Sequence, residues 1–266
     1  MKKTITSILA TGALLFSLSM SLTSCDEMLD YWDKPVSDVY TPTTFKFFNP
    51  NTGQYEKIDL SSYDVTKLTP SSVASLLSGG ILEAGKYIVE GHVNYTGDFN
   101  VGGNGTLELY LQDDASFTIT GGLNASDIDG IKIAGQKEGS GKLIITAEGV
   151  GINAKTLTID GGELTVKGGE NGVTLDPKGA LTVNGGDHTI NATARAIYGS
   201  LVFNNGRLVA SGGGAEPAIS GSWTLAKDTE LKNLTTGATA RADGGVYNGP
   251  FRTSHDGVEM RKYEVF

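Results

Sequence analysis

The 266-residue chain has little cysteine, proline or histidine, and each scarcity excludes a class of protein. One cysteine cannot form a disulfide framework or a cysteine-based zinc site. Seven prolines and no strict Gly-X-Y period exclude collagen. The net charge of −9 argues against nucleic acid as a partner. What remains is a chain with 39% hydrophobic residues and 37 glycines, which has enough apolar surface to form a folded core.

The first 24 residues have the pattern of an export signal. Lys2 and Lys3 precede an apolar stretch that is too diluted by Ser, Thr and Gly to form a good membrane span. The sequence Leu-Thr-Ser-Cys that ends at Cys25 resembles the lipobox of bacterial lipoproteins, where the cysteine becomes the first mature residue and is acylated. The resemblance implies a signal peptide at 1–24 and a palmitate-type lipid on Cys25. The alternative is an ordinary secretory signal that contains a cysteine.

Residues 25–44 are predicted to form a lipidated tether, because acidic residues, prolines and threonines occur there without a clear period. Asp26 and Glu27 follow the cysteine directly. In Bacteroides-like lipoproteins such acidic residues resemble a surface-export signal, whereas in enterobacteria an aspartate there indicates retention in the inner membrane. We expect a cell-envelope lipoprotein that is held in the outer membrane by its lipid and exposed at the surface.

An internal repeat gives the clearest structural signal. Blocks 157–166, 181–190 and 201–210 align without gaps at spacings of 24 and 20. Each block has an apolar-x-apolar pair, a turn of the Asp/Asn-Gly type, and a second such pair, and this period of two predicts strands. The turn residues Asp160, Asn184 and Asn204 are expected to stack as a ladder of hydrogen-bonded side chains.

A third apolar segment recurs at a fixed spacing: Ile152 follows 143–145, Val173 follows 164–166 and Ile197 follows 188–190. Upstream, we align Ile131, which follows 117–119 after a longer insertion, with them. Antiparallel hairpins would suit the turns locally. However, three short segments per period favour a coil. We therefore predict an all-β fold: a right-handed, single-stranded parallel β-helix with about 20–24 residues per coil.

The ends of such a coil need covers, because they expose strand edges. Thr69 and Pro70 before the apolar run 73–77, and Gly79-Gly80 after it, predict a short N-terminal capping helix. The predicted organisation places this helix in an N-terminal segment at 45–80. The β-helix follows at 81–231, and a C-terminal cap at 232–266.

The pattern Leu-Thr-Ile-Asp-Gly-Gly-Glu-Leu-Thr-Val with its following Gly-Val resembles a family of bacterial β-helical carbohydrate-binding domains over residues 117–225. That family includes pectate-binding surface proteins whose fold is similar to that of polysaccharide lyases. The resemblance implies a polysaccharide partner. Pectate-binding members contain calcium, so calcium is the one ion to consider, and no other cofactor is indicated.

The aligned blocks also predict which charged groups lie side by side. Glu163, Asp187 and Arg207 occupy one turn position in successive coils. A calcium site would use Glu163 and Asp187 with further oxygens such as those of Asp160. The alternative is that Arg207 simply bridges Asp187.

Sugar binding would use flat aromatic rings and nearby cations. By alternation Tyr198 faces outward beside Arg195, so Tyr198, Arg195 and Arg207 are the candidate carbohydrate-binding residues. His188 and Trp223 align with leucines of neighbouring blocks and are predicted to point inward.

These observations predict a non-catalytic, monomeric surface protein that binds polysaccharide along one face of the β-helix. We assign no catalytic residues. One alternative is a structural or adhesive surface protein, which a plain Thr/Asn/Ser face would favour. Another is a small polysaccharide lyase, which a cleft with clustered acids and a Lys or Arg would favour.

Overall fold

The computed structural model describes residues 65–246, apart from 78, 137–138 and 214–216, together with 257–262 and the backbone of two strands at 44–49 and 54–59. The predicted signal peptide, Cys25 and the tether up to residue 43 lie outside the described residues. Within the described part of the chain, no helix is both long and apolar enough to cross a membrane.

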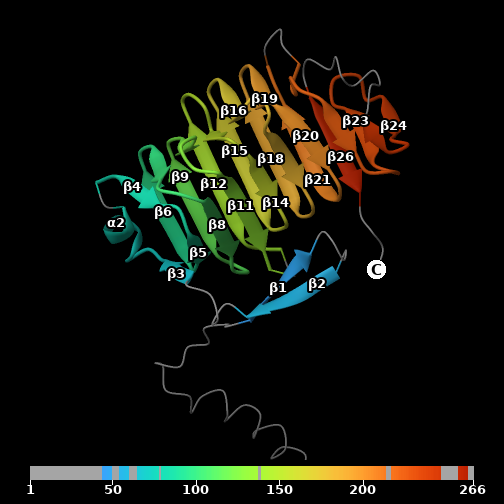
Figure 1. Ribbon diagram of the computed structural model, residues 1–266. Helices are drawn as coiled ribbons and strands as arrows, with labels where there is room; N and C mark the ends of the chain where they lie inside the picture. Colours follow the sequence, from blue (N-terminus) through green and yellow to red (C-terminus); the bar gives the residue numbers. More distant parts are fainter. Residues whose placement is uncertain are drawn as a thin grey trace, which may run out of the picture. The chain divides into compact units, whose positions relative to one another are not determined.

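The described strands form a parallel β-solenoid of about six turns, with about 24 residues per turn (Figure 1). Three sheets run along it, and we number them 1 to 3. Sheet 1 contains β4 (Ile81–Glu83), β7 (Phe99–Gly102), β10 (Leu123–Ala125), β13 (Ile152–Ala154), β16 (Asn171–Leu175) and β19 (Arg195–Tyr198). Sheet 2 contains β3 (Val65–Leu68), β5 (Lys86–Val89), β8 (Thr106–Leu111), β11 (Gly130–Gly135), β14 (Leu157–Ile159), β17 (Ala180–Val183), β20 (Ser200–Phe203), β22 (Trp223–Leu225) and β25 (Gly245–Val246).

Sheet 3 contains β6 (His92–Thr96), β9 (Ser116–Thr120), β12 (Lys142–Ala147), β15 (Glu163–Gly168), β18 (Asp187–Ala192), β21 (Gly206–Ser211), β26 (Val258–Lys262), β23 (Glu230–Asn233) and β24 (Thr239–Arg241). The chain visits sheets 1, 2 and 3 in turn, so each coil adds one short strand to each sheet. Figure 1 shows these strands following one another in chain order, from β4 to β21. Two further strands, β1 (Thr44–Asn49) and β2 (Gln54–Asp59), pair antiparallel with each other.

The core consists of apolar side chains that repeat at the same inward position in every coil. In sheet 2 one such row runs through Leu107, Ile131, Leu157, Leu181, Leu201 and Trp223. In sheet 3 the corresponding row runs through Val93, Phe117, Leu143, Leu164, His188 and Leu208. All these side chains are buried. The predicted register of the three blocks and the inward positions of His188 and Trp223 are therefore confirmed, and the hairpin alternative is wrong for the repeat.

One upstream alignment from the sequence is wrong. Ile131 pairs with Leu157 in sheet 2, whereas Ile152 pairs with Leu123 in sheet 1. A glycine followed by isoleucine begins strands in both sheets, so this dipeptide alone does not identify the sheet. The correct counterpart of Ile152 lies in the three-residue strand β10, which offers only two buried side chains to a sequence pattern.

The turn between sheets 2 and 3 requires a left-handed backbone conformation at its last residue, which is glycine in all three blocks. Gly162, Gly186 and Gly206 have φ values of +80°, +92° and +92°. The residue before each of them is not in this conformation, which explains why the third block tolerates Asn205 where the others have glycine. The left-handed conformation is thus required at the second residue after the Asp or Asn, and not at the first, where an Asx-Gly turn would place it.

A ladder of side chains ties the same corner together across three coils. The Asn184 amide donates to Asp160 Oδ1 at 2.7 Å, and the Asn204 amide donates to Asn184 Oδ1 at 2.7 Å. Asp160 is 4% exposed and also pairs with Lys132 at 3.1 Å. The predicted ladder is confirmed, and it compensates for the burial of a charged carboxylate.

Replacing Asn184 by alanine is expected to lower the free energy of unfolding by about 2–3 kcal/mol, because it removes both ladder bonds and leaves Asp160 with Lys132 alone. Urea unfolding monitored by circular dichroism would measure the change. The matched control is Asn153→Ala, whose amide is half-buried and bonded at 3.3 Å on sheet 1. Equal losses in the two variants would show that the corner ladder has no special role.

The two ends of the solenoid differ. Near the N-terminus, the single-turn helix α2 (Val73–Leu76) is shorter than the predicted run. Ser72 directly precedes it but makes no side-chain capping bond, whereas Thr69 Oγ1 accepts a hydrogen bond from the Ser72 amide at 3.1 Å. At the other end the parallel order stops. There β26 pairs antiparallel with β21, and β23 with β26. Neither pairing follows the repeat.

Candidate functional site

Tyr198 and Arg195 lie together at the last strand of sheet 1. The Tyr198 side chain is 46% exposed, which makes it the only aromatic among the large exposed hydrophobic side chains of the described residues. The Arg195 guanidinium carbon lies 5.2 Å from the centroid of the Tyr198 ring, within the range of a cation–π contact. The sequence therefore predicted this outward aromatic and its neighbour correctly. The contact places the guanidinium over the Tyr198 ring.

A row of polar side chains leads away from Tyr198 along the outer face of sheet 1. Register places the members of this row side by side in successive coils: Asn100, Asn124, Asn153, Thr174 and Tyr198. The amides of Asn124 and Asn153 each donate to the asparagine of the preceding coil at 3.3 Å. We call this set the amide row. Strands in a sheet are about 4.8 Å apart, so its four steps span about 19 Å.

A groove of about 540 Å³ lies beside the first half of the amide row. Its walls include the three asparagines, Thr120 and Thr146 from sheet 3, and backbone at glycines of the corner. Two exposed carboxylates, Asp98 and Glu148, also line it. Asp98 Oδ1 accepts a hydrogen bond from the Gly122 amide at 2.9 Å, which fixes its position at the rim.

Arg207 does not join Tyr198 and Arg195. It lies on β21 in sheet 3, because each coil places residues of successive segments on different faces. Its guanidinium contacts Asp187 and Glu259 at 2.7 Å each. The alternative reading, in which Arg207 bridges Asp187, is the one the structure shows. The second partner lies 52 residues away on β26, where the sequence gave no signal.

Glu259 joins two arginines at the antiparallel end of sheet 3. It is 8% exposed and accepts from both Arg207 and Arg261. Burial tends to raise the pKa of Glu259, but the hydrogen bonds from the two guanidinium groups outweigh this and lower its pKa below the usual range. The paired charges attach β26 to β21.

The three carboxylates considered for calcium do not form a cluster. Glu163 and Asp187 are neighbours in register on sheet 3, but Glu163 pairs with Lys142 at 2.7 Å and Asp187 with Arg207. Asp160 belongs to the corner ladder and pairs with Lys132. Across the described ranges, no group of three or more His, Cys, Asp or Glu side chains is arranged to hold a metal ion.

His188 is a structural residue of the core. It is fully buried, its Nδ1 accepts from the Leu164 amide at 3.3 Å, and its Nε2 donates to the Gly185 carbonyl at 2.7 Å. Desolvation lowers its pKa to about 4, although the bond to Gly185 and the nearby carboxylates of Asp187 and Glu163 act in the opposite direction. It is therefore neutral at pH 7.

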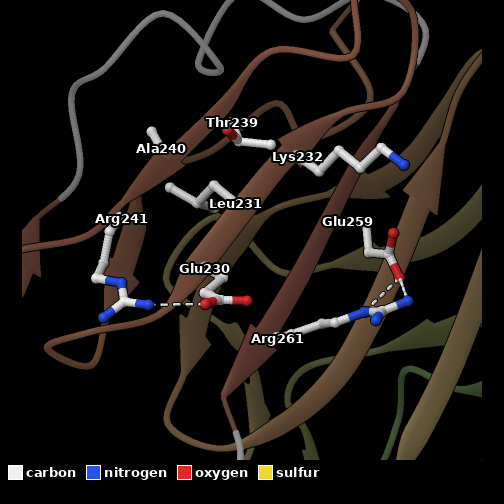
Figure 2. A pocket seen from close by; sticks show the side chains of 8 residues that line it. All are labelled: Glu230, Leu231, Lys232, Thr239, Ala240, Arg241, Glu259 and Arg261. Carbon is white, nitrogen blue, oxygen red and sulfur yellow. Dashed lines mark hydrogen bonds and ion pairs between the residues drawn. The ribbon is translucent and has the colours of Figure 1, made fainter.

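A second hollow, of about 430 Å³, lies at the antiparallel end of sheet 3 (Figure 2). Figure 2 shows Arg241 directed at Glu230 and Arg261 directed at Glu259, and these pairs have distances of 2.8 and 2.5 Å. Each of these arginines already faces a carboxylate, and Lys232 is a third cation in the lining. We place the candidate binding surface on sheet 1, because the exposed aromatic ring of Tyr198 lies there.

The outer face of sheet 3 carries rows of threonine and other polar side chains. One row runs through Thr96, Thr120, Thr146, Lys167, Asn191 and Ser211. A parallel row includes Thr118, Thr165 and Thr189. These two rows are rich in hydroxyl groups, although Ile144 and Val209 interrupt the second. A further row on the same sheet carries the charged side chains of Lys142, Glu163, Asp187 and Arg207.

Sequence reasoning missed the amide row. A signal was present, because Phe99-Asn100, Leu123-Asn124 and Ile152-Asn153 share an apolar residue followed by asparagine. The wrong alignment of Ile131 concealed it.

No protein-family model matches the chain, and comparisons with curated proteins and with solved structures found no significant match. The class of protein is therefore defined by its own geometry: a parallel β-solenoid with repeated coils.

Proposed function

We propose that the protein is a non-catalytic surface lipoprotein that binds polysaccharide along the amide row of sheet 1. The observation that carries this proposal is the exposed Tyr198 ring, in contact with Arg195, at one end of a row that continues through Thr174 to three asparagine amides. Amide groups donate to and accept from sugar hydroxyls, and a flat ring packs against the apolar face of a pyranose. The asparagine amides and the Tyr198 ring occupy the same register position in successive coils, so both could contact one glycan chain that lies across the strands of sheet 1.

The envelope location rests on the sequence. The resemblance of the residues before Cys25 to a lipobox supports a lipid anchor, and the acidic residues that follow support export to the outer surface. A monomer anchored in this way would present sheet 1 to glycans outside the cell.

Two finer features of the fold belong to the same proposal. We assign a right-handed winding, which nearly all connections between parallel strands of one sheet adopt. We also assign to α2 the role of a cap. Its Val73 joins the buried core, and Leu76 and Leu77 pack against that core.

The Tyr198→Ala variant is expected to bind polysaccharide at least tenfold more weakly than the wild type, because a ring contact on a sugar face is lost. The Tyr198→Phe variant keeps the ring and should retain most of the affinity. Calorimetric titration of cellohexaose into each protein measures both. Thr182→Ala, on the outer face of sheet 2, is the control for a surface change elsewhere. Unchanged affinity in Tyr198→Ala would refute the proposed site.

A second candidate is a structural or adhesive protein. The hydroxyl-rich rows on sheet 3 and the scarcity of exposed aromatic rings favour it. Stiff solenoids present such faces to protein partners. Failure of the protein to bind any glycan would favour this second candidate.

A further inference from the structure

The charged side chains that line the groove beside the amide row are all negative. Asp98 precedes the first asparagine of the row, Glu148 lies between the second and the third, and both are exposed; the described residues that line the groove include no lysine or arginine. The whole chain carries a net charge of −9, so the distant charges do not offset this local excess. A hollow lined by one sign of charge concentrates ligands of the opposite sign and repels ligands of its own.

The carboxylates are also placed where a bound chain would pass. Asp98 is two residues before Asn100, and Glu148 is five residues before Asn153, so they belong to the first and third coils of the amide row. The Gly122 amide fixes Asp98 at the corner between sheets 3 and 1. A glycan that lies along the solenoid axis would meet one asparagine per coil and pass both carboxylates.

Building on the proposed polysaccharide binding, we propose that this groove selects glycans that carry protonated amines, accepts neutral glycans less well and rejects uronates. Each ammonium group that approaches Asp98 or Glu148 gains an exposed ion pair, and each uronate carboxylate meets a like charge. The selection comes from the groove beside the three asparagines, which lies two coils away from the contact between Tyr198 and Arg195.

Three β-1,4-linked hexamers that differ only in substituents test this selection: glucosamine, glucose and glucuronate. The full-length protein is titrated with each at about pH 6, below the ordinary pKa of an amine. The glucosamine hexamer is expected to bind about fivefold to tenfold more tightly than cellohexaose, and the glucuronate hexamer at least tenfold more weakly. Added salt should reduce the glucosamine preference, because exposed charges are screened.

The variant Asp98→Asn with Glu148→Gln should bring the glucosamine and glucose hexamers to equal affinity. Asparagine at 98 keeps an oxygen that can accept from Gly122, so the corner is preserved. The matched control is Asp127→Asn with Asp176→Asn, which removes two exposed carboxylates outside the groove and should keep the preference. Equal thermal midpoints of all proteins show that each variant is folded.

The outcomes separate the two proposals. Equal binding of the three hexamers by the wild type, or a preference for glucuronate, overturns the selection and leaves polysaccharide binding standing. An unchanged glucosamine preference in the groove variant also overturns it. Failure of all three hexamers to bind overturns the binding site and the selection together.

Discussion

The Gly186→Ala variant is expected to lose about 4 kcal/mol of unfolding free energy, because strain and overpacking each cost about 1–3 kcal/mol. Gly186 has a φ of +92°, which an alanine adopts only with strain. A Cβ at this position would lie 2.3 Å from the Gly162 carbonyl oxygen and 2.7 Å from the His188 ring. Both neighbours are fixed in the stack of coils, so neither can move away.

Gly161→Ala is the matched control for this loss. Gly161 lies in the preceding coil, one residue before Gly162, which has the positive φ. A Cβ added to Gly161 would lie 3.5 Å from the nearest neighbouring atom, the backbone nitrogen of Gly135. Urea unfolding of both variants, followed by circular dichroism, measures the difference. Similar midpoints for the two variants would contradict the requirement for glycine at the corner.

A second large effect is expected from pH, through His188. Its pKa is about 4 in the folded protein and about 6.5 when exposed, so between these values the unfolded chain binds a proton that the folded chain does not. Stability therefore falls as the pH falls from about 6.5 to 4, by about 3 kcal/mol in total from this residue. Above about pH 6.5 the contribution is fully present.

The variant His188→Leu isolates this effect. Leucine matches the residues above and below it in the stack, but it leaves the Leu164 amide without its acceptor, which costs about 1–3 kcal/mol at pH 7. The loss of stability on acidification should nevertheless be smaller than in the wild type. Urea unfolding at pH 7, 5.5 and about 4 measures it. His92→Gln, at an exposed site of sheet 3, removes an imidazole without changing the core, and equal pH profiles for both variants would refute the assignment.

The repeat made part of the fold predictable. Each block contains two inward apolar pairs and an Asx turn, so the register of Leu157, Leu181 and Leu201 and the corner ladder followed from alignment alone. The inward histidine followed in the same way, because its neighbours in register are leucines.

Other features could not be obtained from such patterns, for physical reasons. The strands of sheet 1 are as short as three residues, so too few inward side chains mark them, and Ile131 was assigned to the wrong sheet. The ion pair between Arg207 and Glu259 depends on an antiparallel strand outside the period. Tyr198 and Arg207 both follow an alternating pattern in the sequence, yet they lie on different sheets. Only the positions of the bends in the coil show which sheet each residue belongs to.

Screening the full-length protein against a glycan array, with and without calcium, tests the central claim most directly, and a reducing-end assay on every glycan that binds completes it. The account predicts binding to neutral or amine-bearing polysaccharides without product formation, and loss of that binding in Tyr198→Ala. Release of new reducing ends would contradict the non-catalytic assignment, and silence on the whole array would contradict polysaccharide binding itself.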